Sequence, residues 1–158
     1  MRENELDWQS LSCVDGPHNS PGFVMWRLFM QWQRGLNARL KPLDLTQPKF
    51  AVLSTISWLS RDGAPVSQQT VAQFLQLDRM HVSQLVSRLD QDGLLDRRLS
   101  PKDQREKLLS PSRLGLEKIR HAMPIVESFD ADFFRRHEAD FLRSFSKGSK
   151  ATQSDHIK

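Results

Sequence analysis

The stretch from Leu77 to Arg105 constrains the fold more than any other part of the sequence. Asp78 is a residue type that caps helix N-termini, and four apolar residues behind it recur at the spacing of one buried helical stripe. Gly93 then favours the end of this helix, so the pattern predicts a helix that begins at Arg79 and buries one face. The four stripe residues are Val82, Leu85, Val86 and Leu89.

A basic hairpin is predicted directly after this helix. Residues 94–99 are extended and partly apolar, 100–103 read Ser-Pro-Lys-Asp and favour a turn, and 105–109 can return as a second strand. Residues 97–107 hold five cations against two acids. A helix followed by such a hairpin is typical of the winged helix-turn-helix. The helix alone would favour the alternative, an amphipathic helix with an ordinary solvated face, but the cationic hairpin reverses this preference.

Length, charge and cysteine content limit the classes of protein to consider. At 158 residues the chain can form one domain with a real core, with or without dimerisation arms. Its net charge of +4 fits a polyanionic partner. The single cysteine, Cys13, excludes an internal disulfide framework and suits a reducing cytosol. No run approaches a membrane span and no apolar signal core is present, so we expect a cytoplasmic protein without membrane association.

Capping residues and prolines predict the elements of the first half. Ser20 followed by Pro21 is typical of a helix start, and Pro42 ends that helix. We expect residues 1–19 to form a flexible acidic arm with a short helical piece around residues 6–11. This arm holds four acidic residues and one arginine.

Two further helices are predicted before residue 77. Thr46 caps one that ends at residues 62–63. Residues 64–66 are short enough to form a strand that pairs with the hairpin. Ser67 then caps a helix through Gln76, which forms a helix-turn-helix pair with the helix that begins at Arg79.

The C-terminal third predicts helices with a large aromatic surface. Ser110 or Ser112 starts a long helix, and Pro124 inside it predicts a kink or break. Residues 139–145 would form a short last helix, and 148–158 a disordered polar tail. Five phenylalanines are too many for these helices to bury alone, so a partner chain is the simplest cover. They are Phe129, Phe133, Phe134, Phe141 and Phe145.

The sequence offers little to an enzyme. Its five histidines are scattered without metal-ligand spacing, and no glycine-rich phosphate loop is present. We therefore expect no catalytic residues, no metal and no cofactor. Cys13 as a redox sensor is an alternative, but no reliable activator lies beside it in the sequence and an incidental cysteine is the simpler interpretation.

Four segments in order carry a resemblance to a known family. They are LTQPKFAVL (45–53), TVAQFLQLD (70–78), VSQLVSRLDQDGLLDR (82–97) and RRLSPKDQREKLLSPSRLG (97–115). The last resembles a wing with an Asp-x-Arg signature at Asp103 and Arg105. Together, over about residues 23–145, they resemble the MarR family of bacterial winged helix-turn-helix transcriptional regulators. Two features depart from that family: residues 110–112 replace its leucine-threonine step, and the chain has no tyrosine.

The resemblance implies a mainly α fold with a small β-wing. A regulator domain over 20–147 would hold a DNA-binding core at about 46–110 and dimerisation helices at about 20–41 and 112–147. The expected function is sequence-specific binding of double-stranded DNA by a homodimer at a palindromic operator in the cytoplasm, associated with the nucleoid, with release by a small-molecule effector. The alternative is a winged-helix adaptor for another protein, or a non-specific DNA-binding protein.

Side-chain chemistry assigns roles within this scheme. A helix N-terminus at residues 67–69 suits phosphate, the exposed side of the helix from Arg79 suits base edges, and the remaining cations suit phosphates. An internal ion pair is the alternative for one of these cations, and for Arg98 it is as well supported as a DNA contact. The resemblance implies that Arg105 enters the minor groove and that Asp103 orients it. The full set is Ser67, Gln68, Gln69, Arg79, His81, Ser83, Gln84, Ser87, Arg88, Arg97, Arg98, Lys102, Asp103 and Arg105.

Three tryptophans suggest a place for an effector. Trp26, Trp32 and Trp58 could line a pocket for a small aromatic molecule between the first, second and fifth helices. The alternative is that they belong to the core or to the dimer interface.

Overall fold

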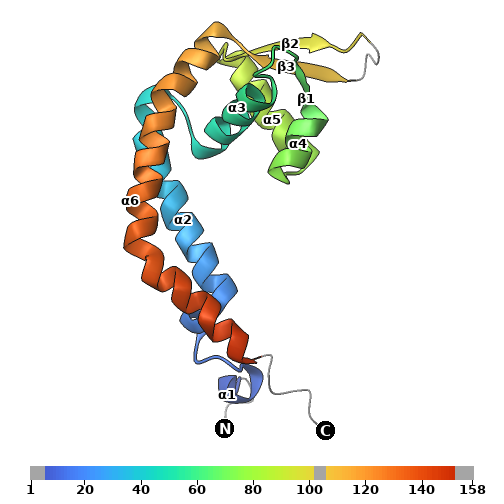
Figure 1. The fold of residues 1–158 in the computed structure, drawn as a ribbon. Helices are drawn as coiled ribbons and strands as arrows, with labels where there is room; N and C mark the ends of the chain where they lie inside the picture. Colours follow the sequence, from blue (N-terminus) through green and yellow to red (C-terminus); the bar gives the residue numbers. More distant parts are fainter. Residues whose placement is uncertain (1–5, 102–105, 152–158) are drawn as a thin grey trace. The chain divides into compact units, whose positions relative to one another are not determined.

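The computed structural model of this chain describes residues 6–101 and 106–151, with side chains up to residue 139 and at Leu142. The described residues are mainly helical, with three short strands, and Figure 1 draws the fold as a ribbon. The elements are α1 (Trp8–Leu11), η1 (Pro17–Asn19), α2 (Pro21–Leu40), η2 (Lys41–Leu43), α3 (Gln47–Leu59), β1 (Val66–Ser67), α4 (Gln68–Leu75), α5 (Arg79–Gln91), β2 (Leu95–Leu99), β3 (Lys107–Pro111) and α6 (Arg113–Ala151).

The chain divides into two units. Residues 36–128 form one, here called the winged unit, and residues 1–35 with 129–158 form the other, here called the helical unit. Helices α2 and α6 contribute to both. None of the described helices is long and apolar enough to cross a bilayer.

The winged unit is built on α3, α4 and α5. The predicted stripe of α5 is buried along its whole length, as are Val71 and Ala72 of α4. Burying each of the larger side chains contributes about 1.5–3 kcal/mol, which is enough to hold α5 against α3 and α4. The mainly α winged helix-turn-helix fold predicted from the sequence is confirmed.

The strands form one antiparallel sheet in the order β1-β3-β2. Val66 of β1 and Arg97 of β2 both lie opposite Leu109 of β3, which is fully buried. The hairpin and its pairing with a strand before α4 are confirmed, although β1 begins two residues later than predicted and β3 runs on to Pro111. The predicted turn falls partly on residues 102–105, which lie outside the described residues.

The three predicted caps of this unit are confirmed. Thr46 accepts from the Lys49 backbone N–H at 3.4 Å, Ser67 from Thr70 at 3.1 Å, and Asp78 from Met80 at 2.7 Å. Such a cap contributes about 1 kcal/mol, so each fixes where its helix begins.

The predicted end of α3 is wrong by a few residues. The helix ends at Leu59, and Ser60 is buried with its hydroxyl donating to the Ile56 carbonyl at 2.7 Å. The Ser60 N–H also bonds the Ile56 carbonyl at 3.0 Å, but the next N–H, that of Arg61, bonds the Trp58 carbonyl at 3.4 Å, so the helical hydrogen-bond pattern stops here. Gly63 follows in a turn with a φ of 87°.

The prediction for the C-terminal third is also wrong in part. Residues 113–151 form one helix, with Pro124 inside it and no separate helix at 139–145. Proline costs about 3 kcal/mol in a helix interior, and buried neighbours such as Ala122 and Val126 offset that cost. Residues 148–151 belong to α6 rather than to the predicted disordered tail, and the rest of that tail lies outside the described residues.

The helical unit pairs α2, up to Gly35, with α6 from Phe129 onward. The Trp32 indole N–H donates to Asp130 at 2.7 Å, and Gly35 lies against the ring of Phe129. Phe129 and Phe133 are buried while Phe134 is exposed. The side chains of the other two phenylalanines, Phe141 and Phe145, lie outside the description.

Candidate nucleic-acid interface

The exposed side of α5 presents a row of hydrogen-bonding groups. Arg79, His81, Gln84 and Arg88 are exposed on this helix, and Ser83 and Ser87 are half-buried among them. Neither arginine forms an ion pair with any residue that the structure describes. Arg is suited to guanine edges and Gln to adenine edges, so the row can read bases.

Asp78 fixes the start of this row. One carboxylate oxygen accepts from the backbone N–H groups of Met80 and His81, at 2.7 and 3.2 Å. Met80 itself is 68% exposed on the same helix, where it offers an apolar contact rather than a hydrogen bond. An exposed thioether can pack against a thymine methyl group.

At the start of α4, fewer side chains are available to contact a phosphate than the sequence predicted. The Ser67 hydroxyl is used by its cap on Thr70 and lies 2.9 Å from the Thr70 hydroxyl. The side-chain Oε1 of Gln68 is buried and has no hydrogen-bond partner among the described residues. Gln69 is exposed, so it is the member of this predicted phosphate site best placed to reach DNA.

The two arginines of β2 differ. Arg97 forms an ion pair with Asp90 at 2.8 Å and is half-buried. Arg98 is exposed and makes no ion pair within the described part of the chain. The internal ion pair that the sequence left open thus falls on Arg97. The other predicted wing residues, Lys102, Asp103 and Arg105, lie outside the described residues.

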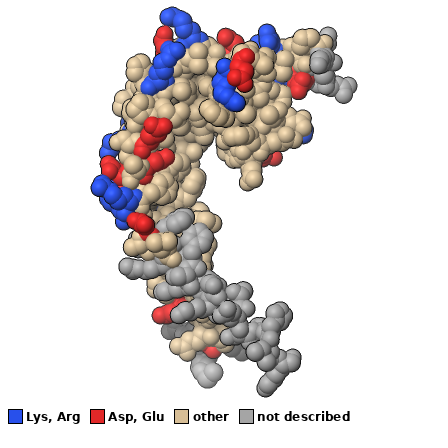
Figure 2. All heavy atoms as spheres, in the orientation of Figure 1, with Lys and Arg blue, Asp and Glu red and all other residues tan. Residues whose placement is uncertain are grey.

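Charge is mixed over the surface. On the face that Figure 2 shows, Lys and Arg side chains alternate with Asp and Glu side chains instead of forming one basic area. The charge distribution on this face therefore does not identify a nucleic-acid interface by itself. The candidate interface is identified by the exposed side chains of α5.

The junction between α5, β2 and α6 was missed by the sequence analysis as a functional element. The Ser112 hydroxyl donates to the Gly93 carbonyl at 2.6 Å and accepts from the Gly115 N–H at 3.0 Å. A Cβ at Gly115 would lie 2.1 Å from the Leu94 carbonyl oxygen. Ser112 as a helix start was the available signal, and the close approach at Gly115 required the structure.

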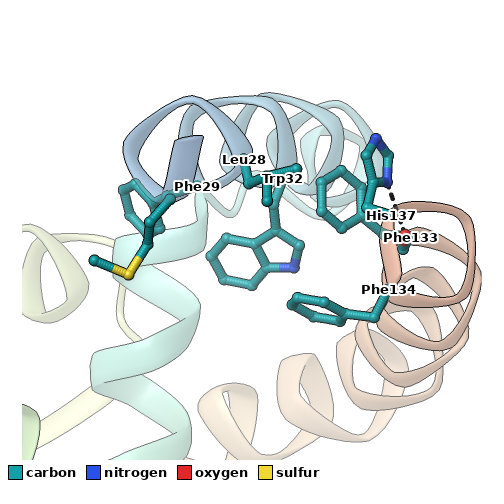
Figure 3. A pocket seen from close by; sticks show the side chains of 7 residues that line it. Leu28, Phe29, Trp32, Phe133, Phe134 and His137 are labelled. Carbon is teal, nitrogen blue, oxygen red and sulfur yellow. Dashed lines mark hydrogen bonds between the residues drawn. The ribbon is translucent and has the colours of Figure 1, made fainter. Parts of the chain in front are cut away.

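A cavity of about 210 Å³ lies within the helical unit. Figure 3 shows Trp32 of α2 and Phe134 of α6 extending toward each other across it. The His137 ring stacks on Phe133 with 4.2 Å between centroids, and its Nδ1 lies 2.8 Å from the Phe133 carbonyl oxygen. The lining residues are Met25, Leu28, Phe29, Trp32, Phe133, Phe134 and His137.

Only one of the three predicted pocket tryptophans lines this cavity. Trp32 does, whereas Trp26 is an exposed residue of α2 beside Phe23, with 5.9 Å between ring centroids. Trp58 belongs to the winged unit, where its exposed ring lies 4.3 Å from the Arg61 guanidinium. The pattern of tryptophans carried no information on which unit each would join.

No cluster of three or more His, Cys, Asp or Glu side chains that could hold a metal ion occurs among the described residues. The one cysteine, Cys13, is exposed.

Comparison with known proteins gives a family, a curated relative and, among solved structures, two of similar fold. The model of the MarR family matches residues 43–106, which include α3, α4, α5 and β2. An uncharacterized HTH-type transcriptional regulator, YdcH, of Bacillus subtilis (strain 168) is 38% identical over 129 residues, 82% of this chain and 86% of that protein.

Solved structures share the fold. A mutant MarR from E. coli complexed with operator DNA has a TM-score of 0.66 and 22% identity, covering 84% of this chain and 92% of that one. CouR from Rhodococcus jostii RHA1 bound to p-coumaroyl-CoA has a TM-score of 0.67 and 20% identity, covering 92% and 99%. At these identities the likeness concerns the fold.

Proposed function

We propose, from the premise that this chain belongs to the MarR family of transcriptional regulators, that it is a sequence-specific DNA-binding regulator that works as a homodimer on a palindromic operator. The observation that carries the proposal is the exposed row of α5. Arg79, His81 and Gln84 are exposed there, and a capped helix with a fully buried stripe holds them in place.

Roles follow from the chemistry of each group. Arg79 and Gln84 would read guanine and adenine edges in the major groove. Arg88 and Arg98 would contact phosphates, and Gln69 would add a hydrogen bond from the start of α4. A relative of the same fold is a MarR protein complexed with operator DNA, which supports this use of the fold.

An exposed apolar strip supports the dimer. Met25, Trp26, Phe29 and Met30 of α2 are between 38% and 58% exposed, and Phe134 of α6 is 51% exposed in the same unit. Contiguous exposed apolar surface is a mark of protein–protein contact, because burying it gains about 25 cal/mol per Å². A second copy of the chain would place a second α5 on the DNA, in the next major groove.

The cavity that Met25, Phe29 and Phe134 of this strip help to line is proposed as the effector site. Its walls are aromatic and apolar, and a flat molecule could stack between Trp32 and Phe134. CouR, which shares the fold, is a protein bound to p-coumaroyl-CoA. The proposal assigns the chain no catalytic activity and places its action in the cytoplasm, at the nucleoid.

Selection from a random pool of duplex DNA tests the main proposal. We expect an inverted repeat whose half-sites lie about one helical turn apart, some 10 base pairs centre to centre. Binding without enrichment would mean a non-specific DNA-binding protein. No binding at low salt would favour the adaptor alternative.

The effector proposal needs a separate test. Small aromatic compounds are screened for those that raise the unfolding temperature and weaken operator binding. Both responses should be reduced in Phe134→Ala, which alters an exposed wall of the cavity. They should persist in Trp58→Ala, which alters an exposed tryptophan of the winged unit that does not line the cavity. Equal responses in the two variants would place the effector elsewhere.

A further inference from the structure

The ion pair between α5 and β2 joins the two parts of the proposed DNA-binding surface. Asp90 lies in the last turn of α5, and the Arg97 guanidinium meets its carboxylate at 2.8 Å. The Arg97 side chain is 22% exposed and that of Asp90 39%. The pair is thus partly sheltered, where a charge-assisted hydrogen bond is stronger than one fully in water.

The sheet register explains why these two neighbouring arginines differ. Arg97 is paired with Leu109, which is fully buried, so the Arg97 side chain starts on the core side of the sheet. Successive residues of a strand point to opposite faces. Arg98 therefore points away from the core, and it is exposed without an ion pair within the described part of the chain.

The pair also changes the charge that DNA would meet. An arginine bonded to a carboxylate adds little net charge near a phosphate, whereas Arg98 offers a cation that no carboxylate of the described residues pairs. Between Asp90 and Arg97 the chain passes through a tight turn, with Gly93 at a φ of 70°. The pair spans this turn and so limits how far β2 can swing relative to α5.

We infer that Arg97 is a positioning residue that sets the wing on the recognition helix through Asp90, and that Arg98 is the phosphate contact of this strand. The inference rests on the proposed function, because α5 and the wing need a fixed relation only if both engage the same DNA. It assigns Asp90, an acidic residue, a favourable role in binding a polyanion.

The direction in which Asp90→Asn changes the affinity for operator DNA tests the inference. If Arg97 only positions the wing, Asp90→Asn loosens it and weakens operator binding about five-fold, which corresponds to roughly 1 kcal/mol. If Arg97 instead contacts phosphate, Asp90→Asn frees its charge and removes a nearby negative charge, so binding strengthens. A strengthened Asp90→Asn variant would overturn the inference.

Asp92→Asn is the matched control. Asp92 follows α5 directly and pairs with Lys49 of α3 at 2.6 Å, away from the wing. This substitution removes the same charge from the same end of the helix without touching Arg97. We expect unchanged or slightly stronger binding. A loss equal to that of Asp90→Asn would overturn the inference, since the effect would then not depend on the wing.

A charge swap adds a rescue. Arg97→Asp should weaken operator binding, and combining it with Asp90→Arg should restore most of the loss. If Arg97 contacted phosphate directly, the swap would not restore binding, and that result would contradict the inference.

Arg98→Ala should lower the slope of log affinity against log salt by about one unit. Thermal unfolding of each variant reports whether it is folded, and a wild-type chain that binds no DNA would defeat the proposed function itself.

Discussion

Three small residues join the turn after α5 to the start of α6 in the winged unit. Gly93, Ser112 and Gly115 bring the turn after α5 against the start of α6 by hydrogen bonds and by close backbone contact. None of these three residues carries charge or bulk. They matter because their small size lets the backbone of the turn after α5 lie directly against the start of α6.

Gly115→Ala tests this close contact. The added Cβ would lie 2.1 Å from a backbone oxygen, which cannot move aside without shifting the chain. We expect a loss of about 1–3 kcal/mol in the free energy of unfolding, measured with denaturant. Gly22→Ala is the control, because nothing lies within 4 Å of its Cβ. It should be neutral or slightly stabilising, and equal losses in the two variants would refute the account of this junction.

At the scale of elements, helix starts were predictable and helix ends were less so. Caps such as Thr46, Ser67 and Asp78 act within three residues, so sequence alone carries their signal. Pro124 also acts locally, and a kink or a break was expected there; α6 continues through it, so the break does not occur, and buried neighbours such as Ala122 and Val126 help to hold the helix together. Tertiary packing cannot be predicted from the local sequence pattern.

Asp78 offers a test at the level of the recognition helix. Asp78→Ala removes the acceptor for two backbone N–H groups at the start of α5. We expect the free energy of unfolding to fall by about 1 kcal/mol, as measured by urea denaturation. Asp78→Asn keeps an oxygen that can accept and should retain most of the stability. Should Asn and Ala cost the same, the cap would not be what stabilises the helix start.

In the candidate site, too, features set by local sequence could be predicted and features set by tertiary packing could not. The row on α5 could be predicted because helical periodicity separates its buried and exposed faces, and the structure has the side chains of Arg79 and Gln84 exposed. Which arginine of β2 forms the ion pair could not be predicted, because that depends on the register with β3. The cavity required the pairing of α2 with α6, residues about 100 positions apart, of which Trp32 and Asp130 give one example.

At the scale of the whole molecule, the exposed apolar strip of α2 predicts self-association. Sedimentation at micromolar concentration should give about twice the chain mass of 18.3 kDa. Trp26→Glu should shift the protein toward monomer, because it places a charge in the proposed interface. Trp58→Glu alters an equally exposed tryptophan in the winged unit and should leave the dimer intact. A wild-type monomer would remove the basis for a palindromic operator.

The most direct test of base reading by α5 compares two DNAs. Fluorescence anisotropy gives the affinities of wild type, Arg79→Ala and Gln84→Ala for two duplexes at the same salt concentration. One is the selected operator, and the other is a shuffled duplex of the same base composition. Each substitution should cost about 1–3 kcal/mol on the operator and much less on the shuffled DNA. Arg98→Ala, a predicted phosphate contact, should weaken both nearly equally. Equal losses on both DNAs at positions 79 and 84 would contradict the account, because α5 would then bind backbone and not sequence.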